Sequence, residues 1–354
     1  MVVINMLKNT FKNNKLSTLS MLLTLPFILI VGLRGGTPDT QVYYNVFLSI
    51  KTLPIFNPID FYLQSGMEIG FGIYSYLIYF FTNSSFVLFS LFSLLNFVFI
   101  YKSATVLNVK YYFVLVVYVS SSYFFMQQFM QIRQGLAISI IFFAAVHYLK
   151  FKRITPFVLL VLLACSFHQS AFVFFIFIII FSIFNGVPYF KGKRFSIFSL
   201  SVAIVLTLLF KFFIIDFVIG MSSRLQSYSQ VSNYSESIGI VNLPMLRTCI
   251  ILMFALLIAS NTLWSNVFFR LVFFIQAIAL STRIGFSDFA ILSGRLSTAF
   301  SYVEIFLLPM VILSRFSLGL SIFFCIIILF IQLVASLIFQ APYLFDMYFI
   351  PLYI

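Results

Sequence analysis

Apolar runs separated by short polar segments repeat along the whole chain. Most runs are roughly 16–22 residues long, and about 20 apolar residues are enough for a helix to cross the hydrocarbon core of a bilayer. The pattern therefore predicts an all-α, polytopic transmembrane bundle of about 11–12 membrane segments. We expect a single integral membrane domain over residues 1–354.

The distribution of lysine and arginine predicts which side of the membrane each loop faces, since cytoplasmic loops carry an excess of both. Lys8, Lys12 and Lys15 precede the first run, which predicts a cytoplasmic N-terminus and an uncleaved first span. Residues 34–66 and 282–295 are predicted to be polar outer segments. The predicted spans are 17–33, 86–101, 111–126, 134–149, 155–167, 169–185, 196–217, 245–260, 266–281, 297–314 and 318–338.

Residues 67–101 hold two apolar segments but must make a single net crossing. We expect 67–81 to be a half-helix or a helix of the outer leaflet, because breaks at membrane depth are tolerated where they line a cavity. The last predicted span then leaves the C-terminus on the outer side.

Composition agrees with a membrane protein: 62% of residues are hydrophobic, 8% are charged, and the mean hydropathy is +1.13. The net charge of +13 is explained by basic residues that mark the cytoplasmic face, so no nucleic-acid partner is expected. The three cysteines have no metal-binding spacing and are interpreted as packing residues. Phosphate-loop, nucleophile-elbow, zinc and dinucleotide motifs are absent, so neither a metal nor another cofactor is expected.

Arginine is concentrated on the predicted outer side, against the usual bias, whereas the inner loops carry mostly lysine. The planar guanidinium group matches phosphate oxygens through two parallel hydrogen bonds. An outward-facing cavity lined by arginines is therefore predicted to bind a phosphorylated or otherwise anionic ligand. The outer basic residues are Arg34, Lys51, Arg133, Arg224, Arg247, Arg283 and Arg295.

Arg133 and His168 are the first candidates for a site, because two adjacent crossings return them to the same side. Arg133 lies among glutamines, including Gln134, and precedes Gly135, which favours a wet cavity over an anchor that reaches lipid headgroups. His168 follows Phe167 at a helix break. A neutral imidazole suits proton transfer near neutral pH, and the alternative is a hydrogen-bonded interfacial histidine.

Acidic residues are few, and each has a structural alternative. Asp39 shares a loop with Arg34, so an ion pair that shapes the loop competes with sugar binding. Glu68 opens an apolar segment, where an acid also suits a helix N-terminus. Glu304 lies in an apolar run and is expected to face the protein interior. Asp288 and Glu236 are interpreted as solvated loop acids, and Arg224 and Arg247 as possible outer-face anchors.

Several segments together resemble the EpsG family of bacterial polysaccharide polymerases, which are Wzy-like membrane proteins. Met67-Glu68-Ile69-Gly70 departs from the Glu-Pro-Gly that is frequent in the family. The segments that carry the resemblance are Gly32-Leu33-Arg34-Gly35-Gly36-Thr37-Pro38-Asp39-Thr40 with Tyr43-Tyr44, Met67-Glu68-Ile69-Gly70-Phe71, Ile132-Arg133-Gln134-Gly135-Leu136-Ala137, Ala164-Cys165-Ser166-Phe167-His168-Gln169-Ser170-Ala171, and Gly294-Arg295 with Tyr302 and Pro309.

The resemblance implies a membrane glycosyltransferase that joins oligosaccharide repeat units carried on undecaprenyl diphosphate, at the outer side of the bacterial inner membrane, without metal or nucleotide. The product would be O-antigen, capsule or exopolysaccharide. The implied base is His168, with Asp39 or Glu68 as the second choice. The residues implied to bind substrate and diphosphate are Arg34, Arg133, Gln134, Arg283, Arg295 and Tyr302.

Three other functions are compatible with the same pattern: a flippase or other transporter of lipid-linked oligosaccharide, a ligase or acyltransferase acting on surface glycans, and a non-catalytic scaffold. A flippase needs a cationic cavity open alternately to both sides, whereas these candidates share one side. The expected partners are the undecaprenyl-diphosphate-linked glycan, the lipid bilayer, and the chain-length regulator and flippase of the same pathway.

Overall fold

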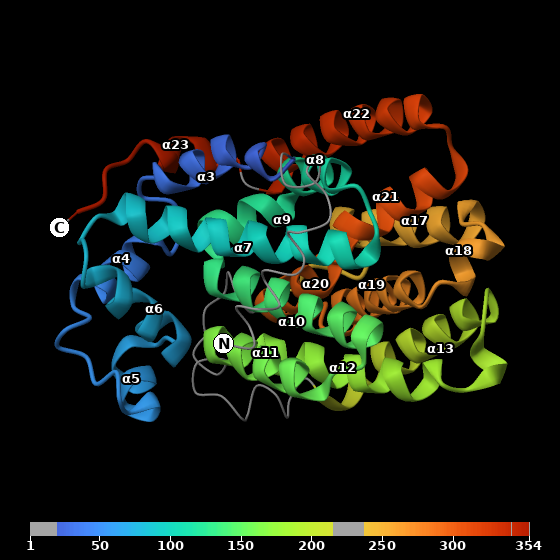
Figure 1. The fold of residues 1–354 in the computed structure, drawn as a ribbon, viewed down its shortest axis with the longest axis horizontal. Helices are drawn as coiled ribbons and strands as arrows, with labels where there is room; N and C mark the ends of the chain where they lie inside the picture. The colour runs from blue at the N-terminus through green and yellow to red at the C-terminus, as the bar shows by residue number, and fades with distance from the viewer. Residues whose placement is uncertain (1–19, 215–236, 341, 354) are drawn as a thin grey trace. The chain divides into compact units, whose positions relative to one another are not determined.

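The computed structural model describes residues 20–214, 237–340 and 342–353. Within these ranges every regular element is helical, which confirms the predicted all-α class (Figure 1). The chain divides into two compact units. Unit 1 comprises Met1–Phe175 and Ile322–Ile354, and unit 2 comprises Ile176–Ser321. The single membrane domain stays a prediction.

Five helical segments of the described ranges are long and apolar enough to cross a membrane, and two bent helix pairs raise the number to seven. The five are Ser85–Leu107, Ile132–Phe151, Arg194–Ile214, Val267–Gly285 and Leu318–Phe339. Shorter apolar helices cover Ser20–Gly32, Ile69–Tyr79, Ile154–Phe167, Ser170–Asn185 and Leu243–Ile258. The polytopic fold is confirmed, while a total of 11–12 membrane segments stays a prediction. The basic residues before the first span lie outside the described residues, so the N-terminal orientation stays a prediction as well.

Unit 1 is built around α10, which packs against α7 and α11, while α3 covers α7 and α6 lies on α11 (Figure 1). Its helices are α3 (Leu25–Gly32), α4 (Thr40–Leu48), α5 (Pro58–Ser65), α6 (Ile69–Tyr79), α7 (Ser85–Leu107), α8 (Tyr111–Ser120), α9 (Ser122–Phe125), η1 (Met126–Met130), α10 (Ile132–Phe151), α11 (Ile154–Phe167), η4 (Ser336–Gln340) and α23 (Leu344–Tyr348). Helices α12 (Ser170–Asn185) and α22 (Leu318–Ala335) each include a unit boundary.

The predicted outer loop 34–66 contains two short helices, α4 and α5. The Asn57 side chain accepts hydrogen bonds from the first backbone N–H groups of α5, and Gly66 ends that helix in the left-handed conformation at φ 66°. Asn57 and Gly66, which the sequence analysis interpreted as turn residues of the loop, therefore define the two ends of α5. Helix α6 has 11 residues, too few to cross the core alone, as the half-helix prediction requires.

The predicted span 111–126 is not one straight helix, because the chain bends by 73° at Ser121, between α8 and α9, and then continues as a π-helical turn, η1. The bend exposes the carbonyl groups at the end of η1, which need hydrogen-bond donors in an apolar environment. The residues before and within α4 supply them. Arg34 donates to Gln128 O, Thr37 to Phe129 O at 3.2 Å, and Tyr43 to Met130 O at 3.2 Å.

A buried polar network joins three helices behind this break. Asn96 on α7 donates to the Tyr118 hydroxyl on α8 at 3.1 Å and accepts a hydrogen bond from Ser139 on α10. Gln128 of η1 donates to the same hydroxyl at 3.0 Å. Each of these side chains is almost fully buried, so the network fixes how α7, α8 and α10 meet.

In unit 2, α13 (Arg194–Leu209) packs against α19 (Val267–Gly285), which also contacts α17 (Leu243–Ile258), α20 (Ala290–Ser301) and α21 (Glu304–Arg315). Arg270 on α19 donates to Asn185 at 2.7 Å and to the carbonyl groups of Trp264 and Ser265 at 3.1 Å. It thereby ties the end of α12 and of α18 (Asn261–Ser265) to α19. Unit 2 also contains η2 (Pro188–Phe190) and η3 (Phe210–Ile214).

The structure adds detail to two predictions for unit 2. The segment 282–295 is mostly helical, because α19 runs on to Gly285 and α20 begins at Ala290. The predicted span 297–314 is two helices, α20 and α21, that meet at an angle of 41°.

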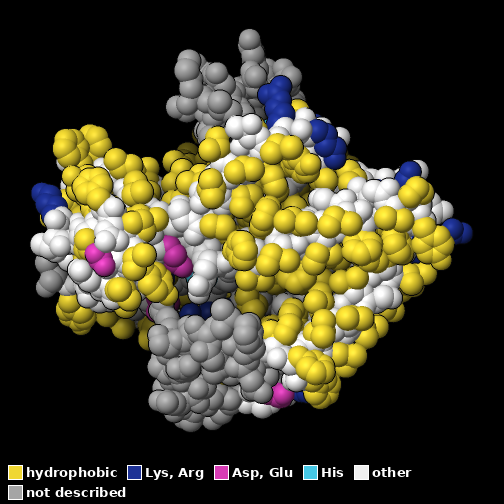
Figure 2. Space-filling model, turned by 90° about the horizontal axis from the view of Figure 1, so that it is seen from below, with side chains coloured by type: hydrophobic (Ala, Val, Ile, Leu, Met, Phe, Trp, Pro, Cys, Tyr) yellow, Lys and Arg dark blue, Asp and Glu magenta, His cyan; other side chains and the backbone are white. Residues whose placement is uncertain are grey.

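Apolar side chains cover much of the visible surface, with Lys and Arg at scattered positions (Figure 2). On α22, Phe323, Ile326 and Phe330 are each more than half exposed. Such a surface is typical of a protein surrounded by lipid, where an exposed phenylalanine carries no hydration cost.

We predict that Asn96→Leu lowers the free energy of unfolding by about 1–3 kcal/mol, because it removes the partner that joins Tyr118 and Ser139. The measurement is unfolding of the purified protein by sodium dodecyl sulfate in mixed micelles. Ser93→Ala is the control on the same helix, since the buried Ser93 hydroxyl has no hydrogen-bond partner. An equal loss in both variants would contradict a structural role for the network.

Candidate functional site

Glu68 and Arg133 form an ion pair in unit 1. The two side chains are 16% and 9% exposed, so the pair is largely shielded from solvent. Glu68 precedes α6 but makes no side-chain cap with that helix, which argues against the helix-terminus interpretation. The centre of the Tyr43 ring lies 5.6 Å from the Arg133 guanidinium carbon. The Glu68 carboxylate is therefore the counter-charge of Arg133.

The second oxygen of Glu68 faces the break between α11 and α12. Its Oε1 atom accepts a hydrogen bond of 3.4 Å from the backbone N–H of Gln169. Gly70 makes this approach possible, because a Cβ atom there would lie 2.6 Å from the Ser166 carbonyl oxygen at the end of α11. Glu68 thus lies between Arg133 and residues 168–170. The sequence analysis expected Arg133 and His168 to lie on the same side of the membrane.

His168 has a defined tautomer in its neutral form. Its Nδ1 atom accepts a hydrogen bond of 3.1 Å from the backbone N–H of Ser170 and lies 2.9 Å from the Ser170 hydroxyl. Because Nδ1 accepts from the backbone, the proton of the neutral ring is on Nε2. In this arrangement the ring offers a hydrogen-bond donor at Nε2, whereas a general base needs an accessible lone pair there.

Arg34 is almost completely buried and has a different environment from Arg133. It donates to Gln128 O, and its guanidinium carbon lies 3.7 Å from the centre of the Phe89 ring. Burial lowers the pKa of Arg34 to about 9, so the group still carries its charge at neutral pH. Within the described ranges no carboxylate forms a salt bridge with it, so the Arg34–Asp39 ion pair considered from the sequence is absent.

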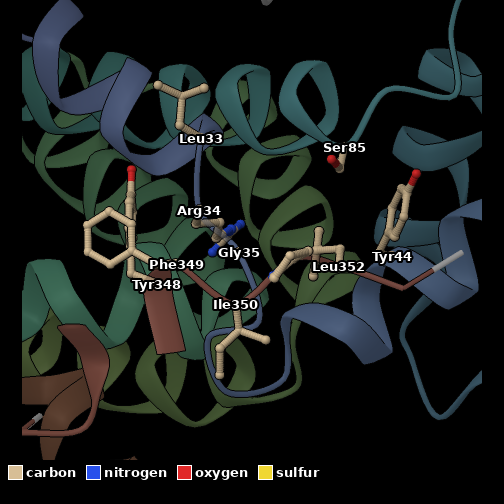
Figure 3. A pocket seen from close by; sticks show the side chains of 10 residues that line it. Leu33, Arg34, Gly35, Tyr44, Ser85, Tyr348, Phe349, Ile350 and Leu352 are labelled. Atoms are coloured by element: carbon tan, nitrogen blue, oxygen red, sulfur yellow. The ribbon is translucent and has the colours of Figure 1, made fainter. Parts of the chain in front are cut away.

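A cavity of about 610 Å³ adjoins Arg34 in unit 1 (Figure 3). Its other wall is residues 348–352, which run from the last residue of α23 into the segment after it, and sequence reasoning missed this wall. Gly35 and Gly36 donate backbone hydrogen bonds to Tyr348 O and Ile350 O, at 2.8 and 2.7 Å. A side chain at Gly35 would collide with both carbonyl oxygens, so only glycine permits this contact.

The remaining candidates of unit 1 lie around these groups. Asp39 is exposed at the start of α4, with φ at 62°. Burial and the nearby charge of Asp39 both raise the pKa of Tyr343, which places Asp39 beside the C-terminal segment. Gln134 is buried next to Arg133 in the first turn of α10. Gly135 allows α10 to pack closely on η1, since a Cβ atom would lie 2.6 Å from Gln127 Cβ.

The other candidates belong to unit 2. Arg283 lies in the last turn of α19 and Arg295 in α20, so both are on helices rather than in a loop. Tyr302 and Glu304 lie at the bend between α20 and α21. Glu304 is fully buried, as expected, and forms an ion pair with Arg247.

Asp288, expected to be solvated, is half exposed and pairs with Lys211 at 3.1 Å. Arg224 and Glu236 lie outside the described residues. Over the described ranges no group of three or more His, Cys, Asp or Glu side chains is placed to hold a metal ion.

The fold and the site define a polytopic helical membrane protein in which Glu68, just before α6, lies between Arg133 on α10 and the break between α11 and α12. The EpsG family matches residues 17–352, so the chain belongs to the EpsG family, whose members are Wzy-like polysaccharide polymerases and exopolysaccharide biosynthesis proteins. This match confirms the resemblance and indicates a role in polysaccharide biosynthesis. No curated protein and no solved structure matches the chain.

We predict that Arg133→Gln lowers the free energy of unfolding by about 3 kcal/mol, because it leaves a shielded carboxylate without its counter-charge. Glu68→Gln/Arg133→Gln should lose less than the sum of the two single changes, because the double variant leaves no unpaired charge. The measurement is a double-mutant cycle in mixed micelles. Lys211→Gln is the control, since its partner Asp288 is half exposed and the pair contributes at most about 1 kcal/mol. Strictly additive losses would contradict the coupling.

Proposed function

We propose that the chain is a membrane glycosyltransferase that joins oligosaccharide repeat units on the outer face of the bacterial inner membrane. The growing glycan is carried on undecaprenyl diphosphate, and the acceptor is the next lipid-linked unit. The single observation that carries this proposal, beyond the family, is the position of Glu68 between Arg133 and residues 168–170. Each Glu68 oxygen keeps a second lone pair besides the one used by Arg133 or by Gln169, so the carboxylate can accept the proton of an acceptor hydroxyl while these contacts hold it in place.

In the proposed reaction, the bond between the anomeric carbon of the donor and the diphosphate oxygen breaks. The acceptor hydroxyl oxygen forms the new glycosidic bond, and its proton passes to Glu68. The diphosphate leaves as an anion, so neither a nucleotide nor a metal enters the proposed step. The transition state has oxocarbenium character, as in glycoside hydrolysis, and positive groups stabilise the charge that develops on the leaving group.

The tautomer of His168 changes the ranking of bases. Because Nδ1 is engaged by Ser170, we propose that the neutral ring donates from Nε2 to a substrate oxygen and that Glu68 is the base. Asp39 is exposed beside the C-terminal segment, which supports it less as a base. Arg133 would orient Glu68. Gln134, Arg283, Arg295 and Tyr302 are proposed as further contacts to the substrate or its diphosphate.

The first experiment is deletion of the gene and restoration with variants, read as the length of the surface glycan and of the glycan on its lipid carrier. Deletion is expected to leave glycan one repeat unit long, and restoration to rebuild the ladder. Single lipid-linked units retained in the inner leaflet would instead identify a flippase. Long lipid-linked chains without surface polymer would identify a ligase.

We predict that Glu68→Gln abolishes the ladder when compared at a matched amount of folded protein, because an amide cannot take the proton. His168→Gln is expected to retain measurable polymer, since the glutamine amide still donates a hydrogen bond. His168→Ala should lose more than His168→Gln. Normal polymer from Glu68→Gln, or equal loss from both His168 variants, would overturn this division of roles.

A further inference from the structure

Helix α5 divides into three faces, each formed by positions one turn apart. Ile59 and Leu63 form an apolar face, and their side chains are 72% and 74% exposed. Asp60 and Gln64 form a polar face, which is also exposed. A helix at the surface of a soluble protein has two faces, since its apolar face is buried and the rest meets water. Helix α5 instead meets three different environments.

The third face fixes α5 to α6. Phe61 is fully buried and packs on Gly72, where a Cβ atom would lie 2.6 Å from Phe61 Cζ. The Ser65 hydroxyl donates to Phe61 O at 2.7 Å and accepts a hydrogen bond of 3.1 Å from the backbone N–H of Met67. These contacts hold α5 in place without any contribution from its exposed apolar face.

The position of α5 in unit 1 indicates what this apolar face meets. Figure 1 shows α4, α5 and α6 gathered at the end of the unit where α7 begins. Helices α7 and α10 are long and apolar enough to cross a membrane, so their ends mark the boundary between hydrocarbon and water. At that boundary an exposed apolar face borders acyl chains, and a polar face beside it borders lipid headgroups and water.

The exposed apolar surface continues from α5 along α6. Ile73 and Leu77 lie one turn apart on α6 and are about half exposed, and Phe80 and Phe81 at its end are more than three-quarters exposed. A lipid surface is the partner that fits, because it covers a narrow apolar edge of any length. A protein partner instead needs a compact patch of about 800 Å² on each side.

We propose that α5 lies in the boundary between lipid headgroups and acyl chains, with Ile59 and Leu63 in the hydrocarbon, and that this insertion sets the depth of Glu68. Gly66 ends α5 and Glu68 follows two residues later, so the two move together. The insertion is independent of the proposed function. Its consequence, that the base is held at the level where a lipid-linked acceptor presents its sugar, rests on that function.

The test places a single tryptophan on each exposed face in turn. The chain has one tryptophan, Trp264, and its Nε1 atom has no hydrogen-bond partner, so Trp264→Phe provides a background at little structural cost. Leu63→Trp and Gln64→Trp are then neighbours on the two faces. Each full chain is reconstituted into phosphatidylcholine nanodiscs, and its fluorescence is quenched by brominated phosphatidylcholine from the membrane and by iodide from the water.

Leu63→Trp is expected to be quenched by brominated lipid at least about twofold more than Gln64→Trp, because an interfacial helix buries its apolar face by roughly 5–10 Å. Iodide is expected to give the opposite order. Bromine near the headgroup should quench Leu63→Trp more than bromine near the end of the acyl chain, since α5 lies in the boundary. Ile59→Trp is a second variant on the same face and should repeat the result.

Three outcomes would overturn the insertion. The first is equal quenching of Leu63→Trp and Gln64→Trp by brominated lipid. The second is quenching of Leu63→Trp by iodide alone, which would show that the apolar face meets water. The third is protection of both Leu63→Trp and Ile59→Trp from both quenchers, which would show that a protein covers the face.

The effect of depth on Glu68 is tested with an acid on each face, read as the length of the surface glycan at a matched amount of folded protein. Leu63→Glu is expected to shorten the ladder, because a carboxylate is costly in hydrocarbon and draws α5 toward water. Gln64→Glu is nearly isosteric and lies on the polar face, so it should keep the native ladder. Native ladders from both variants would overturn the link between α5 and Glu68.

The insertion and the proposed function fail separately. If deletion of the gene leaves glycan length unchanged while Leu63→Trp is quenched by brominated lipid, the polymerase is wrong and the insertion stands. If deletion shortens the glycan while Leu63→Trp is quenched by iodide alone, the polymerase stands and the insertion is wrong.

Discussion

The arrangement of unit 1 depends on one constraint: the carbonyl groups at the end of a broken helix must be hydrogen-bonded within an apolar protein. The bend at Ser121 and the π-helical turn η1 create these groups, and residues 34–43 provide their donors. Arg34 is therefore buried, and the hydrogen bond from Tyr43 holds α4 beside η1. Because α10 starts directly after η1, the same contacts set the position of Arg133. The break in the helix at Ser121 and the candidate site around Arg133 consequently depend on the same contacts.

The two arginines of unit 1 separate into different roles because their counter-charges differ. Arg133 has Glu68 as a partner, which neutralises it and orients the carboxylate toward residues 168–170. Arg34 interacts with a carbonyl and an aromatic ring, neither of which removes its charge. A count of arginines on one side of the membrane does not distinguish the two cases.

Sequence reasoning predicted the helical class and most helix positions. These follow from hydropathy and from antiparallel neighbours, which depend on local sequence. It missed the break at Ser121 and the bend near Tyr302, although serines lie at both, because serine is also common inside straight membrane helices. It also missed the wall formed by residues 348–352, since contacts between distant segments leave no pattern in a single sequence. The roles of the site residues stay predictions.

The wall formed by residues 348–352 also affects biogenesis. Arg34 is translated early, whereas the residues opposite it in the cavity are translated after the whole of Ile176–Ser321. The backbone N–H groups of Gly35 and Gly36 therefore lack their partners until Tyr348 and Ile350 have been translated. The cavity therefore closes only after every segment of unit 2 has emerged from the ribosome, so an interrupted chain can hold the Glu68–Arg133 pair without the cavity.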